Sequence, residues 1–245
     1  MKIGVIGTAC IGKSTFIQDF IANWSMYKLC AKPRYTDLIK EKNLSLNENG
    51  NEESQKIILD SVVDQAMYSP KTDNIIFDRS VLDNLVYTIW LNANGKVSDK
   101  FVKETIDIVR EALVFYDILF FLPISKQSPV QFEPREHRSI SPEYRLEIDN
   151  IFKALVHQYN IGSRVYFPFE HKSGCPAIIE IFGSRQERVQ LAKFYINPKG
   201  ESFGSSESLL TATEEELEAK RLLESAFSPI QAKNKTIIPV TQKNR

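Results

Sequence analysis

The residues best suited to chemistry lie near the amino terminus, where two glycines frame a loop that ends in lysine and serine. The loop reads Gly7-Thr8-Ala9-Cys10-Ile11-Gly12-Lys13-Ser14-Thr15, which fits the pattern G-x-x-x-x-G-K-[ST]. Glycine lets the backbone turn and approach an anion closely, and successive backbone N–H groups then converge on that anion. Lys13 would place a charge beside the β- and γ-phosphates of a nucleoside triphosphate, and the Ser14 hydroxyl could ligate Mg²⁺. The loop therefore predicts a site for a nucleoside triphosphate with Mg²⁺.

The flanks of this loop have the character that a phosphate-binding loop requires. An apolar run over residues 2–6 precedes it and predicts a strand buried on both faces, because polar and apolar residues do not alternate. A helix is expected from Lys13 to Trp24, since its apolar residues recur at helical spacing. That helix would add the positive end of its dipole to the loop. We expect the Lys13 side chain to project into a solvent-filled loop.

A second stretch with chemical potential is Asn74-Ile75-Ile76-Phe77-Asp78-Arg79-Ser80. Apolar residues that end in an acid, in a chain with a phosphate loop, are typical of the Walker B strand, whose carboxylate holds Mg²⁺ or orients the nucleophile. A second interpretation stays open, in which Asp78 only caps the next helix. That helix is expected from Val81 to about Asn94 and should stop at Gly95.

The remaining chain supplies elements that would position these two motifs. Strands are expected at 26–31, 117–122 and 177–182, and helices at 57–66, 98–116, 141–159 and 184–195. The helix after Ser141 should bury one apolar stripe, Leu146, Ile151, Phe152, Leu155 and Tyr159. Alternating strands and helices predict an α/β fold, the three-layer fold of P-loop NTPases, with an approximately five-stranded parallel sheet and helices on both faces. Residues 1–199 would form this domain, and residues 200–245 a partly disordered acidic and polar tail.

The bulk composition narrows the range of partners. Among 245 residues, Lys+Arg and Asp+Glu both number 31, so no global charge attracts nucleic acid or an anionic membrane. Nucleic acid is a possible partner that the composition does not favour. Three separated cysteines argue against a disulfide framework, and no apolar run is long enough to span a membrane. We therefore expect a cytoplasmic protein.

Two further segments could face an acceptor of a phosphoryl group. The loop after the second strand carries Arg34, Tyr35 and Asp37, at the sheet edge where α/β proteins place ligands. Arg34 could meet an acceptor phosphate or be a solvated surface residue, and Tyr35 could stack on a base. The segment from Pro123 to Ser141 has no periodicity and carries Arg135 and Arg138. It is predicted to be a mobile lid over the triphosphate, or else a plain surface loop.

The motifs resemble those of a known group of enzymes, the P-loop nucleoside and nucleotide kinases. Phe77-Asp78-Arg79-Ser80 looks like the Asp-Arg-[Ser/Gly/Tyr] turn of thymidylate and deoxynucleoside kinases. The layout to residue 199 looks most like the nicotinamide-riboside-kinase-like ATPases that DNA phages often carry. His137-Arg138-Ser139 and the closing helix from Gly183 to Val189 contribute to that likeness.

The resemblance implies roles for individual residues. Lys13 and Ser14 would hold ATP and Mg²⁺, Asp78 would serve the metal or the acceptor hydroxyl, and Arg79 would contact phosphate. Arg135 and Arg138 would be lid arginines. One departure concerns the second strand, after which deoxynucleoside kinases carry an acidic general base; the nearest acid here is Asp37, and Lys32-Pro33-Arg34-Tyr35 precede it.

Three functions remain in competition. The first is phosphoryl transfer from ATP to a small nucleoside or nucleotide, with a monophosphate slightly preferred because Arg34 and Arg79 could bind its phosphate. The second is a kinase that acts on a nucleic-acid hydroxyl or a modified base. The third is an ATP-binding regulatory module with little turnover.

Overall fold

The computed structural model describes residues 1–30, 41–42, 44–70, 73–126, 141–160 and 174–203. Within them, five strands form one parallel sheet in the order β2-β3-β1-β4-β5. The strands are β1 (Lys2–Ile6), β2 (Lys28–Leu29), β3 (Ile75–Asp78), β4 (Ile118–Phe121) and β5 (Ala177–Glu180). The expected α/β fold with a five-stranded parallel sheet is therefore confirmed.

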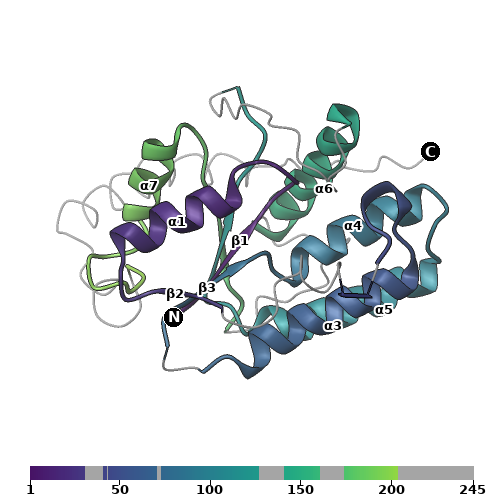
Figure 1. Cartoon of the computed structure of the whole chain (residues 1–245), viewed down its shortest axis with the longest axis horizontal. Helices are drawn as coiled ribbons and strands as arrows, with labels where there is room; N and C mark the ends of the chain where they lie inside the picture. The colour runs from purple at the N-terminus through teal and green to yellow at the C-terminus, as the bar shows by residue number, and fades with distance from the viewer. Residues whose placement is uncertain (31–40, 43, 71–72, 127–140, 161–173, 204–245) are drawn as a thin grey trace, which may run out of the picture. The chain divides into compact units, whose positions relative to one another are not determined.

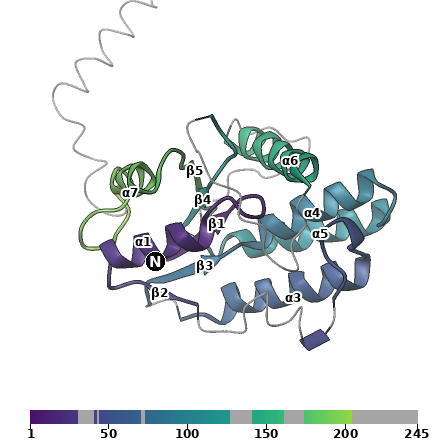
Figure 2. The same cartoon turned by 45° about the horizontal axis from the view of Figure 1, so that its top comes forward.

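Helices cover both faces of this sheet (Figures 1 and 2). One face carries α1 (Lys13–Asn23) and α7 (Arg185–Lys193), which contact each other. The other carries α3 (Glu52–Tyr68), α4 (Val81–Ala93), α5 (Asp99–Leu113) and α6 (Pro142–Asn160). A short 3₁₀ helix, η1 (Asn47–Asn49), precedes α3. The layers are those of the three-layer P-loop fold.

Each face of the sheet has its own apolar core. Side chains alternate along a strand, so Leu119 and Phe121 of β4 pack with α3 to α6, whereas Ile118 and Phe120 pack with α1 and α7. On the second face, Phe20 of α1 lies with its ring centroid 6.0 Å from that of Phe120. Burial on both faces is the physical reason why the strands read as unbroken apolar runs.

Three expectations about element boundaries need correction. Helix α3 begins at Glu52, not near residue 57, because the Asn51 side chain accepts a hydrogen bond from the Ser54 backbone N–H and caps it. Strand β5 ends at Glu180, and Phe182 beyond it is 41% exposed. Among the described residues, β2 is a two-residue strand at the sheet edge.

The predicted stripe of α6 packs against the core except at one position, although Ile151 within it is only partly buried. Leu146 is 49% exposed, whereas Tyr144, Ile148 and Phe152 are buried. These three follow one another four residues apart, so Leu146 lies about half a turn away from each neighbour on the opposite side of the helix.

The chain divides into two units, Met1–Glu201 and Ser202–Arg245. Residues just after α7 are tied to α1 and β2: the Trp24 indole N–H donates to the Asn197 carbonyl at 2.9 Å, and the Tyr27 hydroxyl donates to the Gly200 carbonyl at 2.7 Å. None of the described helices is long and apolar enough to cross a membrane.

Candidate active site

The phosphate-loop candidate joins the carboxyl end of β1 to the start of α1. Gly7, Cys10 and Gly12 have φ angles of 140°, 59° and 89°, which is the left-handed region. Such residues interspersed in a loop let successive N–H groups converge on an anion. Gly7 is required twice over, because a Cβ there would also lie 2.6 Å from the Leu122 carbonyl oxygen.

The amino end of α1 differs from that of the other helices. It has neither a side-chain cap nor an acid in its first turn. Helices α3, α4, α5 and α7 each have both a capping side chain and a first-turn acid. Because free N–H groups and the helix dipole favour an anion, α1 presents the helix end best suited to phosphate.

Lys13 does not project into solvent, as the sequence led us to expect. It is 7% exposed, and its Nζ donates to the carbonyl oxygens of Gly7 and Thr8 at 2.7 Å each. A short loop with left-handed turns brings these carbonyls within reach of the ammonium. The lysine therefore braces the loop from within in addition to placing a positive charge at its centre.

Ser14 and Asp78 meet although 64 residues separate them. The Ser14 hydroxyl donates to Asp78 Oδ2 at 3.0 Å, and both side chains are exposed. Strand β3 pairs directly with β1, so the end of β3 necessarily lies beside the loop that follows β1. A hydroxyl and a carboxylate are oxygen ligands of the kind Mg²⁺ prefers, and Mg²⁺ usually keeps phosphate and water ligands beside them. The donor set fits that metal.

Asp78 does not cap α4, which excludes the alternative interpretation of that residue. Ser80 is the cap: its hydroxyl accepts from the Leu82 N–H, and its own N–H donates to the Asp83 carboxylate at 2.9 Å. This reciprocal arrangement is a capping box. Asp78 is therefore left facing Ser14.

Arg79 directly follows Asp78 and has a strained backbone conformation. Its φ angle is 93°, unusual for a residue with a side chain, and its N–H donates to the Val5 carbonyl at 3.0 Å. The guanidinium lies 3.4 Å from Asp83 Oδ1 and 5.4 Å from the Tyr87 ring centroid. Two residues of α4 thus hold the arginine over the turn.

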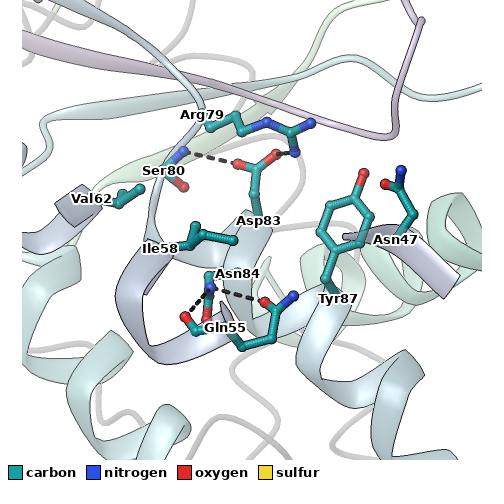
Figure 3. A pocket seen from close by; sticks show the side chains of 9 residues that line it. All are labelled: Asn47, Gln55, Ile58, Val62, Arg79, Ser80, Asp83, Asn84 and Tyr87. Atoms are coloured by element: carbon teal, nitrogen blue, oxygen red, sulfur yellow. Dashed lines mark hydrogen bonds and ion pairs between the residues drawn. The ribbon is translucent and has the colours of Figure 1, made fainter. Parts of the chain in front are cut away.

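A pocket opens below this arginine (Figure 3). Its lining comes from η1, α3, the turn after β3, and α4, and consists of Asn47, Gln55, Ile58, Val62, Arg79, Ser80, Asp83, Asn84 and Tyr87. The Asn84 amide donates to the Gln55 side-chain oxygen and to the Gln55 carbonyl, both at 3.0 Å. The pocket is therefore lined by both apolar side chains and hydrogen-bonding amides, a combination typical of small-molecule sites.

Two polar groups of this pocket are buried, one without and one with hydrogen-bond partners. The Tyr87 hydroxyl is buried and has no hydrogen-bond partner among the described residues. Asp83 is 2% exposed, and this burial raises the pKa of its carboxyl above the usual range, although the charges of Arg79 and Lys13 oppose the shift.

The sequence interpretation missed four polar residues of this pocket, Gln55, Asp83, Asn84 and Tyr87. Ser80-x-x-Asp83 was a readable capping signal. Gln55, Asn84 and Tyr87 gave no signal, because they sit within helices whose apolar pattern predicts only packing against the core.

Arg145, another missed residue, ties α6 to the phosphate loop. Its Nε donates to the Ala9 carbonyl at 3.0 Å, and its own carbonyl accepts from the Thr8 hydroxyl at 3.2 Å. It lies in the first turn of α6, just after the predicted lid. The start of that predicted lid is anchored too, since the Ile124 N–H donates to Asp149 of α6 at 2.9 Å.

Several predicted site residues lie outside the described part of the chain. They are Arg34, Tyr35, Asp37, Arg135 and Arg138. The structure thus assembles Gly7–Thr15 with Asp78 and Arg79, and the roles of the other five stay predictions.

The fold and the loop together define a nucleotide-binding α/β protein of the P-loop class. A family model described as AAA domain matches residues 2–166, and the chain belongs to that family. No curated protein sequence matches the chain.

Solved structures of a kinase and of a second nucleotide-bound protein share the fold. Deoxyadenosine kinase from M. mycoides, with the products dCMP and a flexible dCDP bound, superposes with a TM-score of 0.54 at 19% identity, covering 78% of this chain and 96% of that one. The same kinase with dATP bound gives a TM-score of 0.55 at 18% identity, with the same coverage. NadR protein in complex with NAD and AMP-PNP gives 0.53 at 12% identity, covering 82% of this chain and 50% of NadR. At such identities the likeness establishes the fold.

Proposed function

We propose that this protein transfers the γ-phosphoryl group of ATP, with Mg²⁺, to a small nucleoside or nucleotide. The observation that carries the proposal is the continuity of two sites: Asp78 faces the phosphate loop, and Arg79 and Ser80 directly after it line the pocket. Consecutive residues therefore contact the loop and line the pocket, so a phosphoryl group held at the loop would lie close to a molecule held in the pocket. The deoxyadenosine kinase that shares this fold, and NadR, which binds an ATP analogue, support the assignment.

In this mechanism the phosphate loop holds the donor. Its N–H groups and the start of α1 would bind the β- and γ-phosphates. Lys13, now on the Gly7 and Thr8 carbonyls, would exchange one of those contacts for a phosphate oxygen. Ser14 and Asp78 would hold Mg²⁺, which supplies charge neutralisation when bound.

The turn after β3 would align the acceptor. Transfer of this kind passes through a loose transition state and depends on positioning and charge more than on a strong base. Arg79, fixed by Asp83 and Tyr87, would stabilise the negative charge that develops between donor and acceptor. Asp78 or Asp37 would orient the acceptor hydroxyl.

The chemistry of the pocket lining supports an acceptor with an apolar face and polar edges. Ile58 and Val62 offer an apolar wall, and the Gln55–Asn84 amide pair and the Tyr87 hydroxyl offer polar contacts. The preference for a monophosphate rests on Arg34 and Arg79. Since Asp83 already pairs with Arg79, selection for a phosphate would depend chiefly on Arg34.

The test is incubation of the full chain with γ-labelled ATP and Mg²⁺ against nucleosides, nucleoside monophosphates, nicotinamide riboside and oligonucleotides. Label on a free nucleoside or nucleotide is expected. Label on oligonucleotides alone would favour a nucleic-acid kinase, and ATP binding without any labelled acceptor would favour a regulatory module.

A further inference from the structure

Arg188 is a buried arginine that touches the phosphate loop from outside. It lies on α7 and is 5% exposed. Its Nη1 donates to the Ile11 carbonyl at 2.9 Å, and its Nε donates to the Gly183 carbonyl at 3.0 Å. One guanidinium therefore joins the loop after β1 to the turn after β5, across 177 residues of sequence.

This arginine is an unfavourable residue by the ordinary rules of packing. Among the described residues no carboxylate pairs with it, and its Nη2 is buried without a hydrogen-bond partner. Burial alone lowers the pKa of its guanidinium, which nevertheless stays charged at neutral pH. A buried charge without a counter-ion destabilises a fold relative to an apolar side chain of similar volume. Its value must therefore come from the two backbone groups that it holds.

Those backbone groups matter because of peptide geometry. The N–H and C=O of a peptide unit point in opposite directions, so N–H groups can face an anion only if neighbouring carbonyls face away. Three cations meet the carbonyls of this loop: Lys13 binds those of Gly7 and Thr8, Arg145 binds that of Ala9, and Arg188 binds that of Ile11.

Arg188 acts at the end of the loop where α1 begins. The Ile11 carbonyl belongs to the peptide unit whose N–H is that of Gly12, directly before Lys13 and Ser14. A Cβ on Gly12 would lie 3.0 Å from Arg188 Nη1, so the guanidinium sits tightly against this turn.

We propose that Arg188 is a positioning residue of the donor site: by holding the Ile11 and Gly183 carbonyls, it keeps the last N–H groups of the phosphate loop aimed at a bound triphosphate. The inference rests on the proposed function in that the ligand is a nucleoside triphosphate.

Helix α7 provides a matched control for the test. Arg185 lies three residues earlier, and its exposed guanidinium pairs with Asp19 of α1 at 2.6 Å without touching the phosphate loop. Arg188→Met and Arg185→Met therefore remove the same charge from the same helix, one at the loop and one at the surface. Arg188→Lys keeps the charge but replaces the planar fork of donors with a single ammonium nitrogen.

Three measurements are made on each full-length variant: the KM for ATP, the unfolding temperature, and hydrogen exchange of residues 7–14 without nucleotide. Arg188→Met should raise the KM by about tenfold or more, with faster exchange in the loop and no loss of thermal stability. Arg188→Lys should recover part of the KM, and Arg185→Met should leave both the KM and the exchange unchanged.

Other outcomes overturn the inference. An Arg188→Met protein with an unchanged KM and unchanged loop exchange shows that the arginine does not position the loop. A lower unfolding temperature with an unchanged KM shows a structural role alone. If the wild-type protein binds no triphosphate, the proposed function fails; loop exchange equal in Arg188→Met and Arg185→Met would then overturn the positioning role on its own.

Discussion

The phosphate loop and the proposed acceptor pocket are built in opposite ways. The loop is one continuous segment, Gly7–Thr15, whose conformation follows from left-handed residues and is braced through its carbonyls. The pocket is assembled from η1, α3, the turn after β3, and α4, and its character comes from side chains. A backbone site recognises what all nucleoside triphosphates share, whereas a side-chain site can discriminate between acceptors.

The two regions also differ in what fixes their charges. The Lys13 ammonium donates to two neutral groups of the loop itself, the carbonyls of Gly7 and Thr8. The Arg79 guanidinium is fixed by an ion pair with Asp83 and by its position over the Tyr87 ring. We therefore expect donor-site changes to abolish turnover and pocket changes to alter acceptor use.

The largest effect is expected from Lys13→Met. Removing the ammonium takes away charge stabilisation of the transferring phosphoryl group, which typically lowers kcat by about 10²–10³-fold or more. Because Lys13 also braces the loop, loop exchange should rise as well. Steady-state kinetics measure the first effect, with Lys28→Met on the exposed edge strand as control. Turnover within about threefold of wild type would contradict the assignment.

Asp78→Asn should have the next largest effect. Losing one of two oxygen ligands weakens Mg²⁺ and should lower kcat by about 10²-fold, with a partial recovery at high Mg²⁺. Asp73→Asn is the control, because Asp73 is an exposed acid just before the start of β3. A Mg²⁺ titration that superposes on the wild-type curve would exclude Asp78 from the metal site.

Asp83→Asn separates the two regions. The amide can still accept the Ser80 N–H, but the ion pair that fixes Arg79 is lost. We expect kcat with the acceptor to fall by about tenfold while the KM for ATP stays constant. Asp99→Asn, a first-turn acid of α5 remote from the pocket, is the matched control. A changed KM for ATP with unchanged kcat would place Asp83 in the donor site.

Gln55→Ala should have a smaller effect, limited to the acceptor. Loss of one neutral hydrogen-bonding group is worth about 1 kcal/mol, so the acceptor KM should rise by about fivefold. Gln65→Ala on the same helix, away from the pocket, should leave it unchanged. Equal behaviour of the two variants would show that the pocket does not bind the acceptor.

The smallest effect concerns pH. Since burial raises the pKa of Asp83 in the folded protein, the folded state holds that proton more tightly than the unfolded state. Stability should therefore fall as the pH rises above the usual aspartate pKa of about 4. This part of the decline should disappear in Asp83→Asn when unfolding free energies are compared from pH 4 to 7. Parallel curves for the two proteins would contradict the shift.

The contrast between the regions also explains what the sequence could predict. Gly7–Thr15 was found because a site built from one continuous stretch of backbone leaves a local pattern of residue types, and Asp78 was found because it ends an apolar strand in a chain with that pattern. Gln55 and Asn84 were not, since they lie 29 residues apart and meet only when α3 packs on α4. Arg145 and Arg188 reach the loop from 136 and 177 residues away, a distance at which no spacing rule applies.

Some local features were also misjudged. The Asn51 cap was missed because a polar Asn- and Glu-rich stretch reads as a loop until its last residues begin a helix. Leu146 was assigned to the core by its apolar character alone, although it falls off the buried stripe of α6.

The most direct test follows the phosphoryl group itself. Wild-type, Lys13→Met and Gln55→Ala proteins are incubated with ATP, Mg²⁺ and each nucleoside or monophosphate, and the products are identified by mass spectrometry. The account predicts a phosphorylated nucleoside or nucleotide from the wild type, almost none from Lys13→Met at any acceptor concentration, and a yield from Gln55→Ala that recovers as the acceptor concentration rises. A wild-type protein that hydrolyses ATP without phosphorylating any member of the panel would contradict it.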